Sequence, residues 1–339
     1  MNAARTSDGL TTLIWASQEG HLETVRFLVE RGGANVNAAM TTDGATALIV
    51  ASQEGHLETV RFLVEHGGTN VNAACTSDGV TPLLAATFGG HLETVRFLVE
   101  SGGANVNAAR NSDGMTSLMW ATHKGFSAIA RYLVGREGIN VNAASTDNNT
   151  TSLIFASQHG DLEVVRLLVE HRGASVNAVQ TDIGYTALIW ASQEGHTEIV
   201  RFLMERGGAD VNRAGITDGM TVLMWASLQG HLENVRFLVE RAGATVNAVR
   251  TTDGMTALMW ASQKGRLETV RFLVERANVN AARTTDGLTA LMFASYNGHT
   301  ESVRLLLQHG ADRHALTHAG ETAHALAGAH PLVQAALLA

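Results

Sequence analysis

Histidine is the residue of this sequence best suited to metal binding or acid–base chemistry, and the chain has 15 of them. Six histidines occupy one equivalent position in a repeated segment: His21, His56, His91, His196, His231 and His299. Neighbouring helices lie roughly 8–10 Å apart, whereas two imidazoles that share a zinc ion must each approach it to about 2.0–2.1 Å. Rings repeated in this way cannot easily converge on one ion, so we predict that they bond to the backbone at a turn between helices.

A denser group of histidines lies near the C-terminus: His309, His314, His318, His324 and His330. This group lacks a cysteine and has no regular ligand spacing, so the sequence predicts no metal site and no cofactor. The sequence also lacks motifs for nucleophilic catalysis and phosphate binding, such as G-x-S-x-G, the P-loop and G-x-G-x-x-G after a strand. We therefore predict that the protein is not an enzyme.

Charge and cysteine content narrow the class of protein further. The chain has 24 basic and 32 acidic side chains, and this net charge of −8 does not favour nucleic acid. The single cysteine, Cys75, excludes an internal disulfide and fits a reducing compartment. No apolar run approaches the roughly 18 residues of a membrane span, and the N-terminus does not resemble a signal peptide. We predict a soluble, intracellular, cytoplasmic protein without nucleic-acid binding or membrane insertion.

The regular histidines reflect a repeat of 35 residues, which shortens to 33 near the C-terminus. The segment GHLETVRFLVE at residues 20–30 recurs unchanged at residues 55–65 and 90–100. Altered copies begin at five further glycines: Gly160, Gly195, Gly230, Gly265 and Gly298. A fixed period of this length is typical of stacked supersecondary units that share a continuous core.

Each unit combines turn residues with two segments of helical periodicity, and the second unit is typical. Asp43 and Gly44 predict a tight turn, because glycine accepts the positive φ that such a turn requires. Thr46 is placed to cap a first helix, which ends at Gly55. A glycine pair ends the second helix, and an extended loop leads to the next unit. The second helix has a buried stripe with i, i+3, i+4 spacing: Val60, Leu63 and Val64.

This unit resembles the ankyrin repeat. The residues that carry the resemblance are Gly44, Thr46, Leu48, Ala51, Gly55, His56, Val60, Leu63, Val64, Val71, Asn72 and Ala73. The pattern covers essentially the whole chain, with about nine repeats of 33–35 residues and a degenerate capping unit at the C-terminus. The resemblance implies an all-α solenoid of helix–turn–helix units with extended, hairpin-like loops, elongated and curved.

We expect a single ankyrin-repeat array over residues 1–339. Residues 1–8 match the tail of a missing preceding repeat, residues 9–317 form about nine repeats, and residues 318–339 form the degenerate cap. No polar capping unit precedes the first repeat, although terminal repeats normally need one for solubility. Two interpretations are open: the chain is a fragment of a longer array, or its first repeat stacks end to end on another molecule.

Three further columns of equivalent residues have structural interpretations. Aromatic residues stand where the family normally has a buried leucine, and we predict that they belong to the core: Trp15, Trp120, Phe155, Trp190, Trp225, Trp260 and Phe293. An asparagine column is predicted to bond its amides to the extended backbone: Asn37, Asn72, Asn107, Asn142, Asn177, Asn212, Asn247 and Asn280. An arginine column flanked by glutamates predicts a solvated face, with a phosphate-binding track as the alternative: Arg26, Arg61, Arg96, Arg131, Arg166, Arg201, Arg236, Arg271 and Arg304.

The resemblance also implies a binding site for a protein or peptide on the concave face, formed by loop tips and the exposed side of the first helices. A mostly apolar column follows the turn glycines: Leu10, Ala45, Val80, Met115, Thr150, Tyr185, Met220, Met255 and Leu288. Two interpretations of this column are open, because it could pack on its neighbours or form an exposed stripe for a partner.

Local departures from the repeat favour a central binding patch. Residues 122–139 and the pair Asn148-Asn149 lose motifs that the other copies keep. The residues that we predict to contact a partner are Phe88, Met115, His123, Lys124, His159, Tyr185, Met220 and Met255.

The aspartates at the loop tips are predicted to form turns, and if they also face the partner, that partner is basic. The sequence thus predicts a non-catalytic scaffold that binds a protein or peptide on its concave face. The alternative is a self-associating structural spacer, or a fragment of a longer array, that uses the uncapped face of its first repeat.

Overall fold

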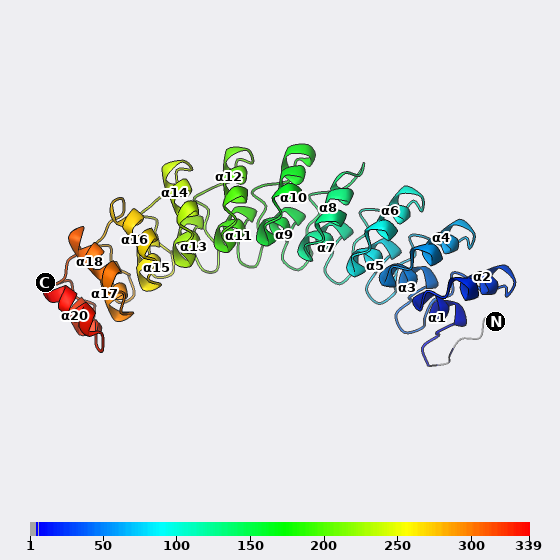
Figure 1. Ribbon diagram of the computed structural model, residues 1–339, viewed down its shortest axis with the longest axis horizontal. Helices are drawn as coiled ribbons and strands as arrows, with labels where there is room; N and C mark the ends of the chain where they lie inside the picture. The colour runs from blue at the N-terminus through cyan, green and yellow to red at the C-terminus, as the bar shows by residue number, and fades with distance from the viewer. Residues whose placement is uncertain (1–4, 6) are drawn as a thin grey trace. The chain divides into compact units, whose positions relative to one another are not determined.

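The computed structural model describes residue 5 and residues 7–339. The regular secondary structure of these residues is helical. Ten helix pairs follow one another, and the strand-like contacts of this part of the chain are isolated β-bridges such as Ala39–Thr46. The predicted all-α repeat fold is confirmed (Figure 1). Contacts divide the chain after Ser175 into two compact units, which we describe separately.

The first unit contains the first five repeats, each with a first helix of odd number and a second helix of even number. Its helices are α1 (Thr12–Gln18), α2 (Leu22–Glu30), α3 (Ala47–Glu54), α4 (Leu57–Glu65), α5 (Pro82–Gly89), α6 (Leu92–Glu100), α7 (Ser117–His123), α8 (Ser127–Val134), α9 (Ser152–His159) and α10 (Leu162–Arg166), which continues as the π-helical turn η1 (Leu167–His171).

The second unit contains the sixth to tenth repeats. Its helices are α11 (Ala187–Glu194), α12 (Thr197–Glu205), α13 (Val222–Gln229), α14 (Leu232–Glu240), α15 (Ala257–Gln263), α16 (Leu267–Val274), α17 (Ala290–Tyr296), α18 (Thr300–Gln308), α19 (Ala323–Leu326) and α20 (Pro331–Leu338). Over the described part of the chain, no helix has both the length and the apolar character needed to span a membrane.

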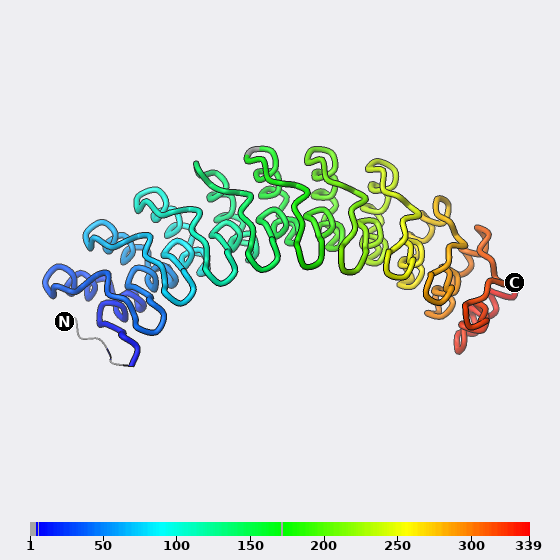
Figure 2. Tube along the Cα trace, turned by 180° about the vertical axis from the view of Figure 1, so that it is seen from behind, coloured from blue at the N-terminus to red at the C-terminus, as the bar shows by residue number. Residues whose placement is uncertain are grey.

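Within each unit the helices form two layers. The first helices pack side by side, as α1 does on α3 and α3 on α5, and the second helices form a separate row, as α2 does with α4. The loops between repeats run along the side of the first helices (Figure 2). We call the surface formed by the loops and the first helices the loop face.

Apolar side chains from both helices of a repeat meet between the layers. In the second repeat Leu48 and Ile49 of α3 and Val60 and Leu63 of α4 are at most 2% exposed. Burying one such side chain stabilises the folded state by about 1.5–3 kcal/mol. Because every repeat buries the same stripe against its neighbours, this packing holds each unit together.

Turns and caps match the sequence pattern. The Thr46 hydroxyl accepts a hydrogen bond from the backbone N–H of Ile49 (3.4 Å), as predicted for the N-cap. Gly44 and Gly55 have φ values of 78° and 76°, in the left-handed region that favours glycine. A Cβ at Gly44 would also lie 2.6 Å from the backbone nitrogen of Thr76, so the close approach of the next loop requires glycine as well.

Two polar columns join each repeat to its neighbour. His56 Nε2 donates to the carbonyl oxygen of Gln18 in the preceding repeat (2.9 Å). The Asn37 side chain accepts from the backbone N–H of Asn70 in the next repeat (2.9 Å) and donates to the carbonyl oxygen of Gly68 (3.4 Å). The predicted backbone bonding is confirmed for the asparagine column and for His56, His91, His231 and His299, and the partners lie in adjacent repeats.

The arginine column lies on the second-helix side. The Arg61 side chain is 44% exposed, lies 3.8 Å from the Glu58 carboxylate and stacks over the ring of Phe97 in the next repeat at 4.8 Å. Arg96 makes the same contact with Tyr132 at 5.4 Å. The solvated face is confirmed, and the cation–π contacts give these arginines a structural role.

Candidate protein-binding surface

Aspartates shape the tips of the loops, as the sequence predicts. The Asp43 carboxylate accepts from the N–H of Ala45 (2.9 Å), and its backbone carbonyl accepts from the N–H of Thr76 in the next loop (2.8 Å). The same pair of bonds recurs at Asp78 and Asp113. Successive loops are therefore held in register. The backbone bond uses only Oδ1 of each carboxylate, so Oδ2 can bond to a side chain, as that of Asp113 does to Arg110.

The apolar column that follows the turn glycines is buried except at Leu10 and Leu288, which are half-buried, so its interpretation as an exposed stripe is wrong. Met115, Tyr185, Met220 and Met255 are between 1% and 7% exposed. Adjacent loops are joined by direct hydrogen bonds, so they cover these side chains and leave them packed between loops and first helices. The other interpretation, packing on neighbours, is the one that the structure shows.

The aromatic column is more exposed than its predicted place in the core. Trp15 is 48% exposed, the other tryptophans and Phe155 are half-buried, and Phe293 is buried at 4%. The position lies in the middle of the first helix, on the side that faces the loop, as Arg110 over the Trp120 ring shows. A ring that is larger than the leucine of the family therefore extends past the core onto the loop face, which is why the prediction is wrong for most of the column.

Four of the predicted contact residues come together around Trp120 in the first unit. The ring of Phe88 lies 4.4 Å from that of Trp120, and Lys124 Nζ lies 5.1 Å from the same ring. The ring of His123 lies 5.8 Å from Trp120 and 6.3 Å from His159. We call these five residues the aromatic cluster.

The aromatic cluster combines apolar surface with positive charge. Lys124 is exposed, whereas burial, then Lys124 and His159, lower the pKa of His123 and keep its ring neutral at pH 7. The guanidinium of Arg110 lies over the Trp120 ring at 5.1 Å, but it is paired with Asp113. Lys124 is therefore the cation of this surface that can reach a partner.

Beside the aromatic cluster the first unit has a recess where the aromatic column is interrupted. Val50 and Ala85 occupy the aromatic position in the second and third repeats. A cavity of about 330 Å³ opens between these repeats. Its lining includes Asp43, Ile49, Val50, Cys75, Asp78 and Phe88. Phe88 therefore borders both the cavity and the aromatic cluster.

Tyr185 has a structural role in the second unit. Its hydroxyl donates to the carboxylate of Asp218 in the next repeat, and its ring lies 5.4 Å from Trp190. Gly215 makes room for it, because a Cβ at this position would lie 2.8 Å from the tyrosine ring. Burial first, and then the bond to Asp218, raise the pKa of Tyr185, so the phenol remains a donor at neutral pH.

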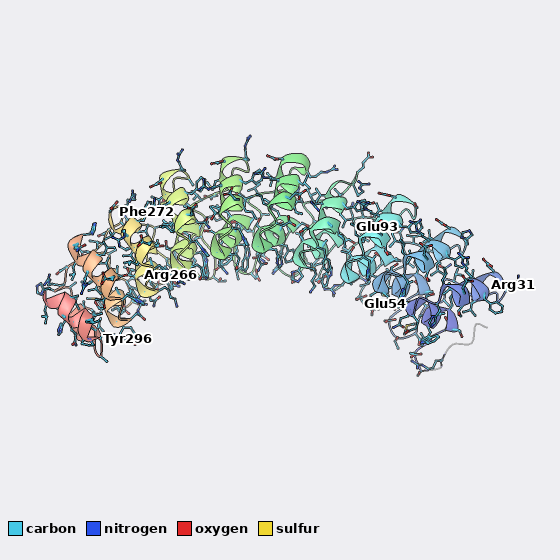
Figure 3. All side chains as sticks on the ribbon, viewed as in Figure 1. Arg31, Glu54, Glu93, Arg266, Phe272 and Tyr296 are labelled. Carbon is cyan, nitrogen blue, oxygen red and sulfur yellow. The ribbon has the colours of Figure 1, made fainter. Side chains whose placement is uncertain are left out.

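A second cavity, of about 480 Å³, lies in the second unit between the ninth and tenth repeats. Its lining includes Arg283, Leu288, Phe293, Tyr296 and Leu326. Tyr296, at the end of α17, is 64% exposed (Figure 3). Among the described residues no three histidine, cysteine, aspartate or glutamate side chains are grouped to hold a metal ion.

The repeated helix pairs and loops agree with the comparisons to known proteins. The family model described as ankyrin repeats (3 copies) matches residues 1–75, 68–145, 139–215, 212–283, 242–317 and 277–336. The chain belongs to the ankyrin repeat family. The crystal structure of the human ASB11 ankyrin repeat domain is similar in fold, with 27% identity and a TM-score of 0.59 over 66% of this chain and 97% of that one. No curated protein matches the chain.

Ankyrin repeats are in general protein–protein interaction modules. The sequence patterns alone did not indicate the half-exposed Trp120 or the two cavities of this ankyrin-repeat chain. A usable signal was present in the second, third and fourth repeats, where residues ten positions apart change together. Arginine precedes tryptophan at Arg110 and Trp120, whereas Cys75 precedes Ala85.

Proposed function

We propose that this ankyrin-repeat chain is a non-catalytic scaffold that binds a protein or peptide segment on the loop face of its first unit. The aromatic cluster carries the proposal, because it presents the partly exposed edges of half-buried rings together with the exposed Lys124 on the loop face. Protein interfaces are enriched in such aromatic anchors with a polar rim. The cavity beside Phe88 adds a recess for a side chain of the partner.

A random dodecapeptide library displayed on phage, panned against the full chain, tests the proposal. The loop-face variant carries Phe88→Gln, Lys124→Glu and His159→Glu, which restore residues that other repeats have at these positions, as at Gln53 and Glu54. We expect the selected peptides to bind this variant at least about tenfold more weakly, as for loss of an interface hot spot.

The matched control carries Glu93→Gln and Arg96→Gln on the second helix α6, where Figure 3 labels Glu93. Its peptide affinity should be unchanged, and circular dichroism should show the same helix content for both variants. Peptides that bind the loop-face variant as tightly as the parent chain, or a library that yields no binder, would overturn the proposal.

A second candidate function rests on the exposed end of the first repeat. Phe27 is 53% exposed, whereas the equivalent Phe62 and Phe97 are 5% and 4% exposed beneath the arginine of the preceding repeat. As the alternative, we propose that this end face stacks on another copy of the chain. Sedimentation velocity should then show a mass that rises with concentration and a monomer for Phe27→Glu. One mass over a wide concentration range would exclude this candidate.

A further inference from the structure

Three repeats fill the slot between loop and first helix with the same set of side chains. In the fourth repeat, Arg110 Nε donates to Oδ1 of Asp113 (3.1 Å), and its Nη2 bonds to the other carboxylate oxygen. The guanidinium also lies 5.1 Å over the ring of Trp120. The eighth and ninth repeats use equivalent sets: Arg250, Asp253 and Trp260, and Arg283, Asp286 and Phe293.

The second and third repeats lack both the arginine and the aromatic ring of this set. Met40 and Cys75 stand at the arginine position, and Val50 and Ala85 stand at the aromatic position. All four substitutions shorten or remove the side chain that would fill the slot. The cavity of about 330 Å³ lies between these two repeats.

The aspartate of the set is kept in both repeats, as Asp43 and Asp78. Each carboxylate accepts from a backbone N–H of its own loop, as Asp113 does, but no described side chain donates to it. The other five aspartates of this column each have a side-chain partner: Asp8, Asp113, Asp218, Asp253 and Asp286. The two aspartates without such a partner are therefore the two that line the cavity.

The cavity is negatively charged, and its lining combines apolar side chains with three neutral polar ones: Gln18, Gln53 and Ser77. The charged residues of its lining are Asp43 and Asp78, with no basic side chain, and its apolar residues include Ile49 and Val50. Burial first, then Asp78 and Asp43, raise the pKa of Cys75 to about 11, so the thiol adds no charge at neutral pH. A concave apolar site with a few placed polar groups is typical of ligand recesses.

We infer that this cavity receives an arginine side chain from a partner protein, together with an adjoining aromatic or large aliphatic side chain. The inference rests on the proposed loop-face function and specifies the chemistry of its partner. The incoming guanidinium takes the place that Arg110 occupies in its own slot and bonds to the carboxylate of Asp78, with Asp43 nearby. The adjoining side chain takes the place of the missing tryptophan.

Arginine fits this site better than lysine. The Arg110 pair engages both oxygens of Asp113, and a planar guanidinium can do this while it stacks on an aromatic ring. A lysine ammonium is a point charge without this fork. The partner should also bind more weakly as salt rises, because the attraction includes two carboxylates that salt screens.

The test uses the peptides selected from the phage library and measures their affinity by fluorescence polarisation. We expect them to contain arginine beside an aromatic or large aliphatic residue, and to bind at least about tenfold more weakly when that arginine is replaced by glutamine. Cys75→Arg gives the chain its own arginine in the slot and should weaken binding to a similar degree. Asp43→Asn with Asp78→Asn should do the same without a change in side-chain size.

The matched control is Glu58→Gln with Glu93→Gln, which removes two carboxylates from the second helices and should leave affinity unchanged. If Cys75→Arg loses helix content by circular dichroism, the paired asparagine variant decides the outcome, because it is isosteric. Adding Ala85→Trp to Cys75→Arg rebuilds the set of the fourth repeat and should abolish the remaining binding.

Four outcomes overturn the inference. Selected peptides that lack arginine, or that bind the Cys75→Arg and paired asparagine variants with full affinity, would show that the cavity is not an arginine site. The proposed function would survive if Lys124→Glu with His159→Glu still weakened those peptides. Peptides indifferent to every loop-face variant, or a library without binders, would overturn the proposed function together with the inference.

Discussion

The loops of the third and fourth repeats have the same backbone bonds but different contents. Asp78 and Asp113 each accept from the N–H two residues later and join the next loop through their carbonyl oxygens. In the fourth repeat Arg110 and Trp120 fill the space beside the aspartate, whereas the third repeat leaves a recess. Two side chains in one repeat can therefore change a structural slot into a candidate binding site without altering the scaffold.

This comparison separates the residues that hold the array together from those that distinguish one repeat from another. The second helices of the first three repeats are identical in sequence, because each must bury the same stripe and stack the same arginine. The side chains in the slot beside the loop can differ between repeats, since hydrogen bonds between loops already fix the backbone there. Specificity can therefore vary there at little cost to the fold.

Emptying the filled slot should give the largest effect. Trp120→Ala removes contacts with Phe88 and Arg110, and we expect a loss of about 2 kcal/mol in the free energy of unfolding. Truncating a fully buried aromatic residue costs about 3–5 kcal/mol, and Trp120 is half-buried. Urea unfolding followed by circular dichroism measures the change. Trp15→Ala, at a position that is 48% exposed, should cost less than about 1 kcal/mol, and equal losses would contradict a filled slot.

A medium effect should follow in the sixth repeat, where Tyr185 bonds to the loop aspartate Asp218 in place of an arginine. Tyr185→Phe removes the hydrogen bond to Asp218 but keeps the ring, so we expect a loss of about 1 kcal/mol in the same urea measurement. Tyr296→Phe is the control, because this residue is 64% exposed, and its stability should not change. A neutral Tyr185→Phe would mean that the hydroxyl does not contribute to loop stability.

The smallest effect concerns acid stability. The Arg110 guanidinium, through its hydrogen bonds, holds the pKa of Asp113 below its ordinary value. The folded pKa is lower than the unfolded one, so this contribution to stability is complete above about pH 4 and is lost as the pH falls further. Asp113→Asn should therefore flatten the fall of the urea midpoint below about pH 4. Asp253→Asn, whose pKa is lowered in the same way by Arg250, should give the same result, and an unchanged slope in both would contradict the ion-pair explanation.

Several parts of the candidate site could be predicted from the sequence. The departures from the repeat at residues 122–139 led to His123 and Lys124, which the structure brings together with Phe88 around Trp120. The apolar character of Met115 predicts a contact with the partner, whereas its burial depends on the distance between adjacent loops. A single repeat does not reveal that distance, because it is set by stacking.

The sequence by itself determined the local structure of this protein. Thr46 can cap a helix and Gly44 can adopt a positive φ wherever they stand, and the spacing of Val60 and Leu63 defines one face of any helix. These properties belong to neighbouring residues along the chain, so the period of 35 residues was enough to read the fold.

Only the tertiary structure decided which columns are covered and which reach the surface. Met255 is buried, in a column that the sequence left open between packing and exposure, and Trp15 is exposed, in a column that the sequence predicted to be core. The partners of Asn37 and His56 likewise lie in other repeats. Burial and hydrogen bonding depend on the surfaces that stacking brings together. The cavity lies between the second and third repeats because neither of them has the arginine and the aromatic ring that fill this space in the fourth repeat.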